Sequence, residues 1–136
     1  GGPMACALVV AGGNAASTEE LVSGVSRGIY VRRFHYVNGM LDPRRAVMTG
    51  LTPDGTFVIE NGKVARAVGN MRFTDSLLEA FERCDGLTSR RWVRPNWWSD
   101  AGSVAAPAVR IRELRFTGGS QVLPRLDDGD VASVVR

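Results

Sequence analysis

The chain has 136 residues, of which 44% are hydrophobic and 23% charged, and its formal net charge is +3. These values suit one compact globular domain and exclude the disordered, collagenous and coiled-coil classes. The longest uncharged apolar run, residues 4–13, is shorter than the roughly 20 residues that a membrane-spanning helix needs, and no basic segment precedes it as in a signal peptide. We therefore expect a soluble, cytoplasmic protein with no membrane partner.

Residues 5–10 form a short apolar run, which is typical of a buried strand. Ser17 and Glu20 match a capping box, in which a hydroxyl and a carboxylate satisfy free backbone donors. This pattern predicts a helix over about 18–27, closed by Gly28 in a left-handed conformation.

Residues 29–37 are aromatic and β-branched, which predicts one strand. Both sides of that strand are partly apolar, so we expect it to be central and covered on both faces. Alternation places Tyr30, Arg32, Phe34 and Tyr36 on one side, and Ile29, Val31, Arg33, His35 and Val37 on the other.

The middle of the chain predicts loops, strands and a hairpin. Asn38–Gly39 and Asp42–Pro43 mark loops, and residues 46–51 form another strand. After a turn at 52–55, the hairpin 56–68 reverses at Asn61–Gly62, because a type I′ turn needs positive φ at both positions.

Ser76 and Glu79 repeat the capping box and predict a second helix over about 76–85. Gly86 would end it. The apolar residues of one face, which we expect to be buried, are Leu77, Leu78, Phe81 and Cys84.

The last third of the chain predicts an irregular stretch and a long strand. Residues 87–106 show no regular pattern, whereas residues 108–117 form a strand whose apolar positions change side, which predicts a β-bulge near Arg112. The tail, residues 120–136, is expected to be partly ordered. Together the elements predict an α+β fold in which residues 1–119 form a single β-rich domain, with two short helices on a mainly antiparallel sheet of at least six strands.

The chemistry of the side chains excludes several enzyme classes. His35 is the single histidine, so the chain alone lacks the ligands of a hydrolytic zinc site, and no nucleophile elbow or phosphate-binding glycine loop is present. Cys6 and Cys84 fit neither a disulfide framework nor a metal site, and we expect both to be reduced. We assign no catalytic residue, metal ligand or cofactor to this chain.

Arg33 and His35 share a strand face, where Arg33 could hold a carboxylate and His35 could exchange a proton. With the adjacent Tyr36, they are our candidates for a substrate cleft. The alternative is a buried His35 that bonds to a backbone carbonyl.

Three tryptophans and three arginine doublets could also recognise a partner. Trp92, Trp97 and Trp98 could stack a base, clamp a peptide or anchor a neighbouring domain, and we treat them as interface candidates. We expect the doublets to be solvated or paired with acids, rather than to form a nucleic-acid footprint. The doublets are Arg32–Arg33, Arg44–Arg45 and Arg90–Arg91.

Several motifs resemble the C-terminal domain of the TldD/PmbA family, which is metalloprotease-related and was formerly called modulator of DNA gyrase. The most specific are D-G-x-F-x-I-E-N-G at residues 54–62 and G-N-x-R-F-T-x-S at 69–76. The similarity runs from about Ala5 to Gly119. The remaining matched stretches are Gly28–Asn38, Asp42–Pro43, Met48–Lys63 and Pro107–Phe116.

This resemblance implies a preceding domain with an H-E-x-x-x-H helix that supplies two zinc ligands and the general base, and a cysteine ligand from the C-terminal domain. The present sequence contains no H-E-x-x-x-H and no cysteine between Trp92 and Pro107, and Cys84 does not match. No zinc ligand is carried over, so zinc is expected only in a longer parent protein or a partner subunit.

The resemblance therefore predicts a catalytically silent domain that forms one wall of a cleft for an extended, unfolded peptide. Its expected partners are a zinc-bearing domain or a TldD/PmbA-type subunit, in a homo- or heterodimer. Two alternatives stay open: a nucleic-acid-associated module that uses its arginines and tryptophans, and a homodimer formed through an exposed sheet edge.

Overall fold

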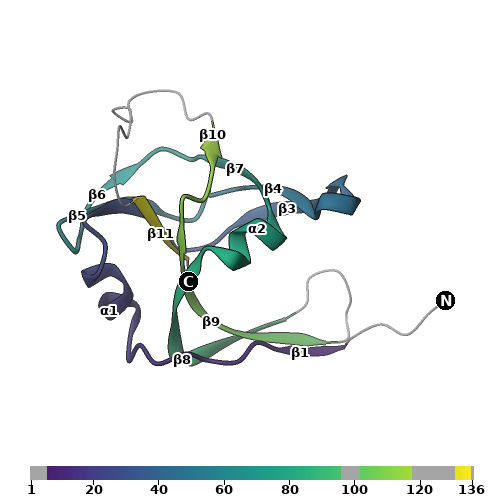
Figure 1. Ribbon diagram of the computed structural model, residues 1–136, viewed down its shortest axis with the longest axis horizontal. Helices are drawn as coiled ribbons and strands as arrows, with labels where there is room; N and C mark the ends of the chain where they lie inside the picture. The colour runs from purple at the N-terminus through teal and green to yellow at the C-terminus, as the bar shows by residue number, and fades with distance from the viewer. Residues whose placement is uncertain (1–5, 96–101, 118–130, 136) are drawn as a thin grey trace.

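The computed structural model describes residues 6–95, 102–117 and 131–135. These residues form eleven strands, two short α-helices and one 3₁₀ turn, arranged in two sheets (Figure 1). Of the nine strand pairings, seven are antiparallel and two are parallel. The expected α+β fold, mainly antiparallel with two short helices, is confirmed.

The larger sheet has seven strands in the order β1–β9–β11–β2–β5–β6, and β8 pairs with the other edge of β9. Strands β8 and β9 form a long ribbon at the bottom of Figure 1. The seven strands are β1 (Ala7–Val9), β2 (Arg27–Val31), β5 (Thr56–Glu60), β6 (Lys63–Val68), β8 (Cys84–Pro95), β9 (Ser103–Arg112) and β11 (Val131–Val135).

The smaller sheet has four strands in the order β10–β7–β4–β3, so β3 is one of its edges. It lies across the top of Figure 1. Its strands are β3 (His35–Asp42), β4 (Val47–Leu51), β7 (Arg72–Ser76) and β10 (Phe116–Thr117), and the 3₁₀ turn η1 (Pro43–Arg45) joins β3 to β4.

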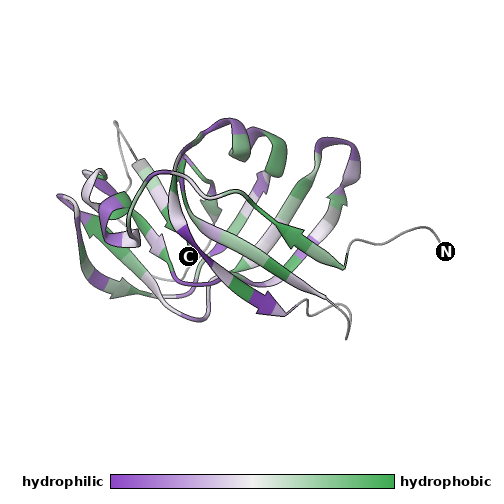
Figure 2. Cartoon of the chain, turned by 90° about the horizontal axis from the view of Figure 1, so that it is seen from below, coloured by the Kyte–Doolittle hydropathy of each residue, from purple (hydrophilic) through white to green (hydrophobic). Residues whose placement is uncertain are grey.

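Two apolar clusters hold the fold together, one on each side of β2. Helix α1 (Thr18–Ser23) packs its buried Leu21 and Val22 in the first cluster, with Ile59, Ala132 and Val134 of the larger sheet. The second cluster contains Ile29, Val31, Val58 and Met71. Strand β2 is therefore central and covered on both faces, as predicted for the strand over 29–37, whereas β3, which takes up the rest of that segment, is a sheet edge. Figure 2 shows green, hydrophobic segments alternating with white and purple ones along the strands.

The features set by local chemistry are confirmed. Asn61 and Gly62 have φ of 49° and 74°, as the type I′ turn between β5 and β6 requires. The Ser17 hydroxyl accepts a hydrogen bond from the Glu20 N–H at 3.2 Å. Ser76 caps α2 (Leu77–Glu82) in the same way.

The single strand expected over 29–37 is wrong, because the chain changes sheet in the middle of it. Strand β2 ends at Val31, and β3 begins at His35 in the other sheet. Val31 pairs with Thr56, the first residue of the antiparallel strand β5, so the pairing of β2 ends there. The next N–H, of Arg32, donates to the carbonyl of Gly55 in the turn before β5. Asn38–Gly39 lies inside β3 and is not a loop.

The first strand and the first helix also differ from expectation. Strand β1 is exposed and not buried, with Val9 66% accessible, because it lies at the sheet's edge. Helix α1 ends at Ser23 instead of residue 27. Gly28 does not close it but lies within β2, where a Cβ atom would stand 1.9 Å from the carbonyl oxygen of Ala132.

The buried face predicted for the second helix is wrong in part. Leu78 and Phe81 are exposed, and Ala80 is the buried residue of α2. Arg83 ends this helix, so Cys84 lies half-buried in β8 instead of on a helical face. A helix this short covers little of the sheet.

The irregular stretch predicted over 87–106 is wrong for residues 87–95 and 103–106, whereas residues 96–101 lie outside the described residues, and the predicted bulge near Arg112 is wrong. Strand β8 extends to Pro95 and β9 begins at Ser103. The change of apolar side after Arg112 marks a turn at Glu113 (φ 53°) that carries the chain into β10 of the other sheet. Of the tail, residues 131–135 form β11, which pairs with β2 and β9; residues 120–130 lie outside the described part.

Within the described residues, neither helix has the length and apolar character needed to span a bilayer.

Candidate peptide groove

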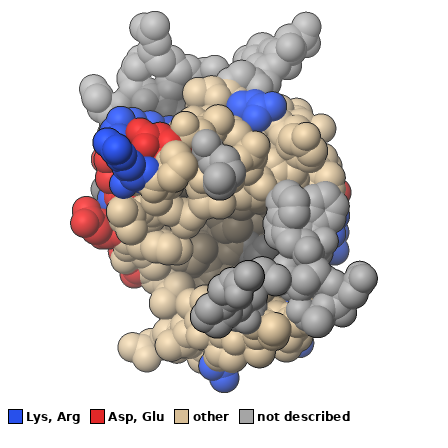
Figure 3. Space-filling view, turned by 90° about the vertical axis from the view of Figure 1, so that its right-hand side faces the viewer, with Lys and Arg blue, Asp and Glu red and all other residues tan. Residues whose placement is uncertain are grey.

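A groove of about 520 Å³ lies between the start of β3 and the β8–β9 ribbon. The segment 33–37 forms one wall. The space-filling view from the right-hand side of Figure 1 shows the surface hollowed, with mostly uncharged walls (Figure 3). The opposite wall consists of Trp92, Arg94, Pro95, Val104, Ala106 and Pro107.

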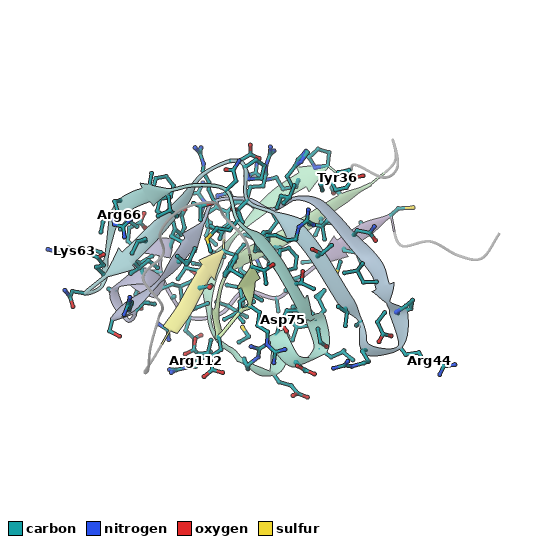
Figure 4. All side chains as sticks on the ribbon, turned by 90° about the horizontal axis from the view of Figure 1, so that it is seen from above. Tyr36, Arg44, Lys63, Arg66, Asp75 and Arg112 are labelled. Carbon is teal, nitrogen blue, oxygen red and sulfur yellow. The ribbon has the colours of Figure 1, made fainter. Side chains whose placement is uncertain are left out.

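The first wall is shaped by the bend between the two sheets. Phe34 turns inward and packs against Phe73, with ring centroids 4.4 Å apart. Tyr36 has φ of 53°, a left-handed conformation that is uncommon for an aromatic residue. The residue is 65% exposed and lies near the molecule's outer edge (Figure 4). The bend thus anchors one aromatic ring in the core and presents another at the groove.

Arg33 and His35 both line the groove, although they belong to no common strand face. The Arg33 guanidinium forms an ion pair with Asp54 of the turn before β5. His35 is exposed, so it is not the buried histidine of the alternative interpretation, and it pairs in register with Leu51.

The second wall is held by Trp92, which is half-buried and packs against the first apolar cluster. The guanidinium carbon of Arg90 lies 5.7 Å from the Trp92 ring centroid, within cation–π range. The cleft candidates and one interface candidate therefore lie in the same groove. Trp97 and Trp98 lie outside the described residues.

The groove carries positive charge. Its described lining includes Arg33 and Arg94 and contains no Asp or Glu. Across the described part of the chain, no three His, Cys, Asp or Glu side chains gather closely enough to hold a metal ion. The described lining also contains no cysteine, so it does not supply the one ligand that the family resemblance implies for this domain.

A second cavity, of about 460 Å³, adjoins α1 and the start of β8. There the Asp85 carboxylate accepts hydrogen bonds from Nε of Arg110 at 2.6 Å and Nε of Arg112 at 2.7 Å. Burial raises the pKa of Asp85, but these bonds and positive charges outweigh it and lower the pKa below its ordinary value. A carboxylate held by two arginines suits a structural tie between β8 and β9 rather than proton transfer.

Apart from Trp92, sequence reasoning did not find the residues of the second wall. Arg94, Val104 and Ala106 lie in the stretch 87–106 that shows no regular pattern, because β8 and β9 alternate apolar and polar residues only weakly. Pro107 lies in a motif matched to the family, which is the one signal that could have pointed to it.

The fold and the groove define a β-rich, two-sheet domain with a cleft beside the edge of the smaller sheet. The sequence model of the PmbA/TldA metallopeptidase C-terminal domain matches residues 2–118, and the chain belongs to this family.

The solved structures agree on the fold. The chain is similar to TldE from Thermococcus kodakarensis, with a TM-score of 0.65 at 15% sequence identity over 81% of this chain. The match spans only 23% of that TldE chain. No curated protein sequence matches.

Proposed function

We propose that this chain forms one wall of a peptide-binding groove in a TldD/PmbA-type protein, that it docks against a zinc-bearing domain or partner subunit, and that alone it is catalytically silent. The observation that carries this proposal is the groove itself, which lies beside the start of the edge strand β3 and has largely apolar walls. An edge strand offers backbone N–H and C=O groups to an extended segment, and apolar walls favour its side chains.

Catalytic silence is supported by the chemistry of the described side chains, since the groove holds one histidine, His35, and no carboxylate or thiol among its described lining residues. A hydrolytic zinc ion needs about three protein ligands. The missing ligands would come from the docked domain or subunit.

Peptide binding is tested by fluorescence anisotropy with a labelled, unstructured peptide that alternates valine with polar residues. We expect saturable binding by the purified chain. Val104→Arg would fill the groove and weaken binding at least about tenfold, because a buried apolar contact is replaced by a bulky charge. Val64→Arg is the matched control, since Val64 is 47% exposed on β6, outside the groove lining.

Equal effects of the two substitutions, or no binding by the unmodified chain, would refute the proposed groove. The proposed lack of catalytic activity is tested separately by metal analysis and a peptidase assay. We expect no stoichiometric zinc and no cleavage, and a chain that holds zinc and cleaves an unfolded substrate would overturn that part of the proposal.

A further inference from the structure

We infer that the groove selects extended peptides that carry an acidic side chain among apolar ones. This inference rests on the proposed function and adds the class of substrate. It follows from the charges along the groove, where Arg33 and Arg94 stand on opposite walls and the described lining holds no Asp or Glu.

Arg94 is the main candidate for binding an acidic side chain. It lies near the end of β8, paired in register with Val104 across the ribbon, and it is exposed at the groove. Among the described residues no acid forms an ion pair with it. Its guanidinium can therefore accept a carboxylate from a bound peptide in bidentate fashion, without first breaking an ion pair with a described residue.

Arg33 adds a second guanidinium on the other wall of the groove. Its partner, Asp54, is not part of the groove lining, and the pair is exposed, with 57% of the Arg33 side chain accessible. An exposed ion pair is weak and exchangeable, so the guanidinium stays available to a second carboxylate. A lysine or arginine in the peptide would meet the like charge of Arg94.

The wall that carries Arg94 also supplies the apolar part of the pattern. Trp92, Val104 and Ala106 offer contacts for apolar side chains, and Val104 is the direct partner of Arg94 across the ribbon. A peptide alongside the start of β3 would therefore meet apolar surface and the Arg94 guanidinium on the same wall, which suits an acidic side chain among apolar ones.

The test compares three labelled peptides of equal length and alternating valine, with Glu, Gln or Lys at the centre and an amidated C-terminus. We expect the Glu peptide to bind about fivefold tighter than the Gln peptide, and the Lys peptide most weakly. The preference should shrink between about 50 and 300 mM salt, because screening weakens exposed pairs. A Gln peptide with a free C-terminal carboxylate should gain nothing over its amidated form.

Arg94→Gln should bring the Glu-to-Gln affinity ratio close to one, whereas Arg66→Gln, an equal change on exposed β6, should leave the ratio unchanged. Circular dichroism checks that both variants are folded. If the Gln peptide binds as well as the Glu peptide, or if the free terminal carboxylate reproduces the gain, this inference is wrong while the groove stands. If no peptide binds, the proposed peptide-binding function itself is refuted, and the preference for acidic peptides is refuted with it.

Discussion

Replacing Asp75 by alanine should destabilise the fold more than the loss of any exposed ion pair. The Asp75 carboxyl is buried in β7 (Figure 4), where it accepts hydrogen bonds from Nη2 of Arg83 at 2.9 Å, from the N–H of Arg115 at 3.2 Å and from the N–H of Ser76 at 2.9 Å. Removing it leaves two backbone donors and a guanidinium without their acceptor. This carboxyl holds the chain where it passes from β9 to β10.

The magnitude follows from burial. Breaking a buried pair by removing one partner costs about 3–5 kcal/mol. The Arg83 side chain is 23% exposed and also donates to the backbone carbonyls of Glu79 and Glu113, so we expect the lower end of that range, about 3 kcal/mol. For a domain of this size, such a loss lowers Tm by roughly 5–15 °C.

Urea and thermal unfolding followed by circular dichroism measure the loss. Asp54→Ala is the matched control, because its ion pair with Arg33 is exposed and should be worth less than about 1 kcal/mol. A double-mutant cycle with Arg83→Met isolates the pairwise contribution. If Asp75→Ala costs no more than Asp54→Ala, the reasoning from burial is refuted.

Two further predictions concern the sheets. Gly28→Ala should lower the free energy of unfolding by about 2 kcal/mol or more, because the new Cβ would collide with the backbone of β11. Gly69→Ala is the control and should change that free energy by less than about 0.5 kcal/mol, because nothing lies within 4 Å of its new Cβ. Equal urea midpoints for the two variants would contradict this prediction. Asp85→Asn should lower the free energy of unfolding by less than about 1 kcal/mol at pH 7. The difference from the wild type should disappear in acid, because the pKa of Asp85 in the folded state lies below the ordinary value of 3.8. The stability that the ionised carboxylate contributes is lost as the pH falls through that folded-state pKa. A cost that grows towards acid pH, in unfolding curves measured from pH 7 to 2, would show that the sign is wrong.

Short-range chemistry made part of the fold predictable. The Asn61–Gly62 turn and the Ser17 and Ser76 caps depend on backbone dihedral angles and hydrogen bonds within four residues, and all three occur as expected. The strand over 46–51 was also recognisable as β4, because a turn follows it directly. In each case the deciding contacts are present in the local sequence.

Long-range pairing made the rest unpredictable. Residues 29–37 have strand composition throughout, since β2 and β3 are both strands, and composition carries no sign that the chain changes sheet between them. The apolar residues change side after Arg112 for the same reason, because the chain passes into the other sheet at this point. From the local sequence alone, we interpreted this change as a bulge within one strand. The polar, arginine-rich β8 lacks a strand pattern because most of it lies at an exposed edge.

The change of sheet between β2 and β3 is also what creates the groove. A straight strand over 29–37 would have kept Phe34 and Tyr36 on one face, both in the core or both in solvent. The bend instead packs the half-buried Phe34 against Phe73 and leaves Tyr36 beside the ribbon, so that the start of β3 in one sheet faces β8 and β9 of the other. The segment whose local pattern misled the strand prediction is thus the segment that builds the candidate site, and a substitution that straightened it would remove the groove wall even if both sheets still formed.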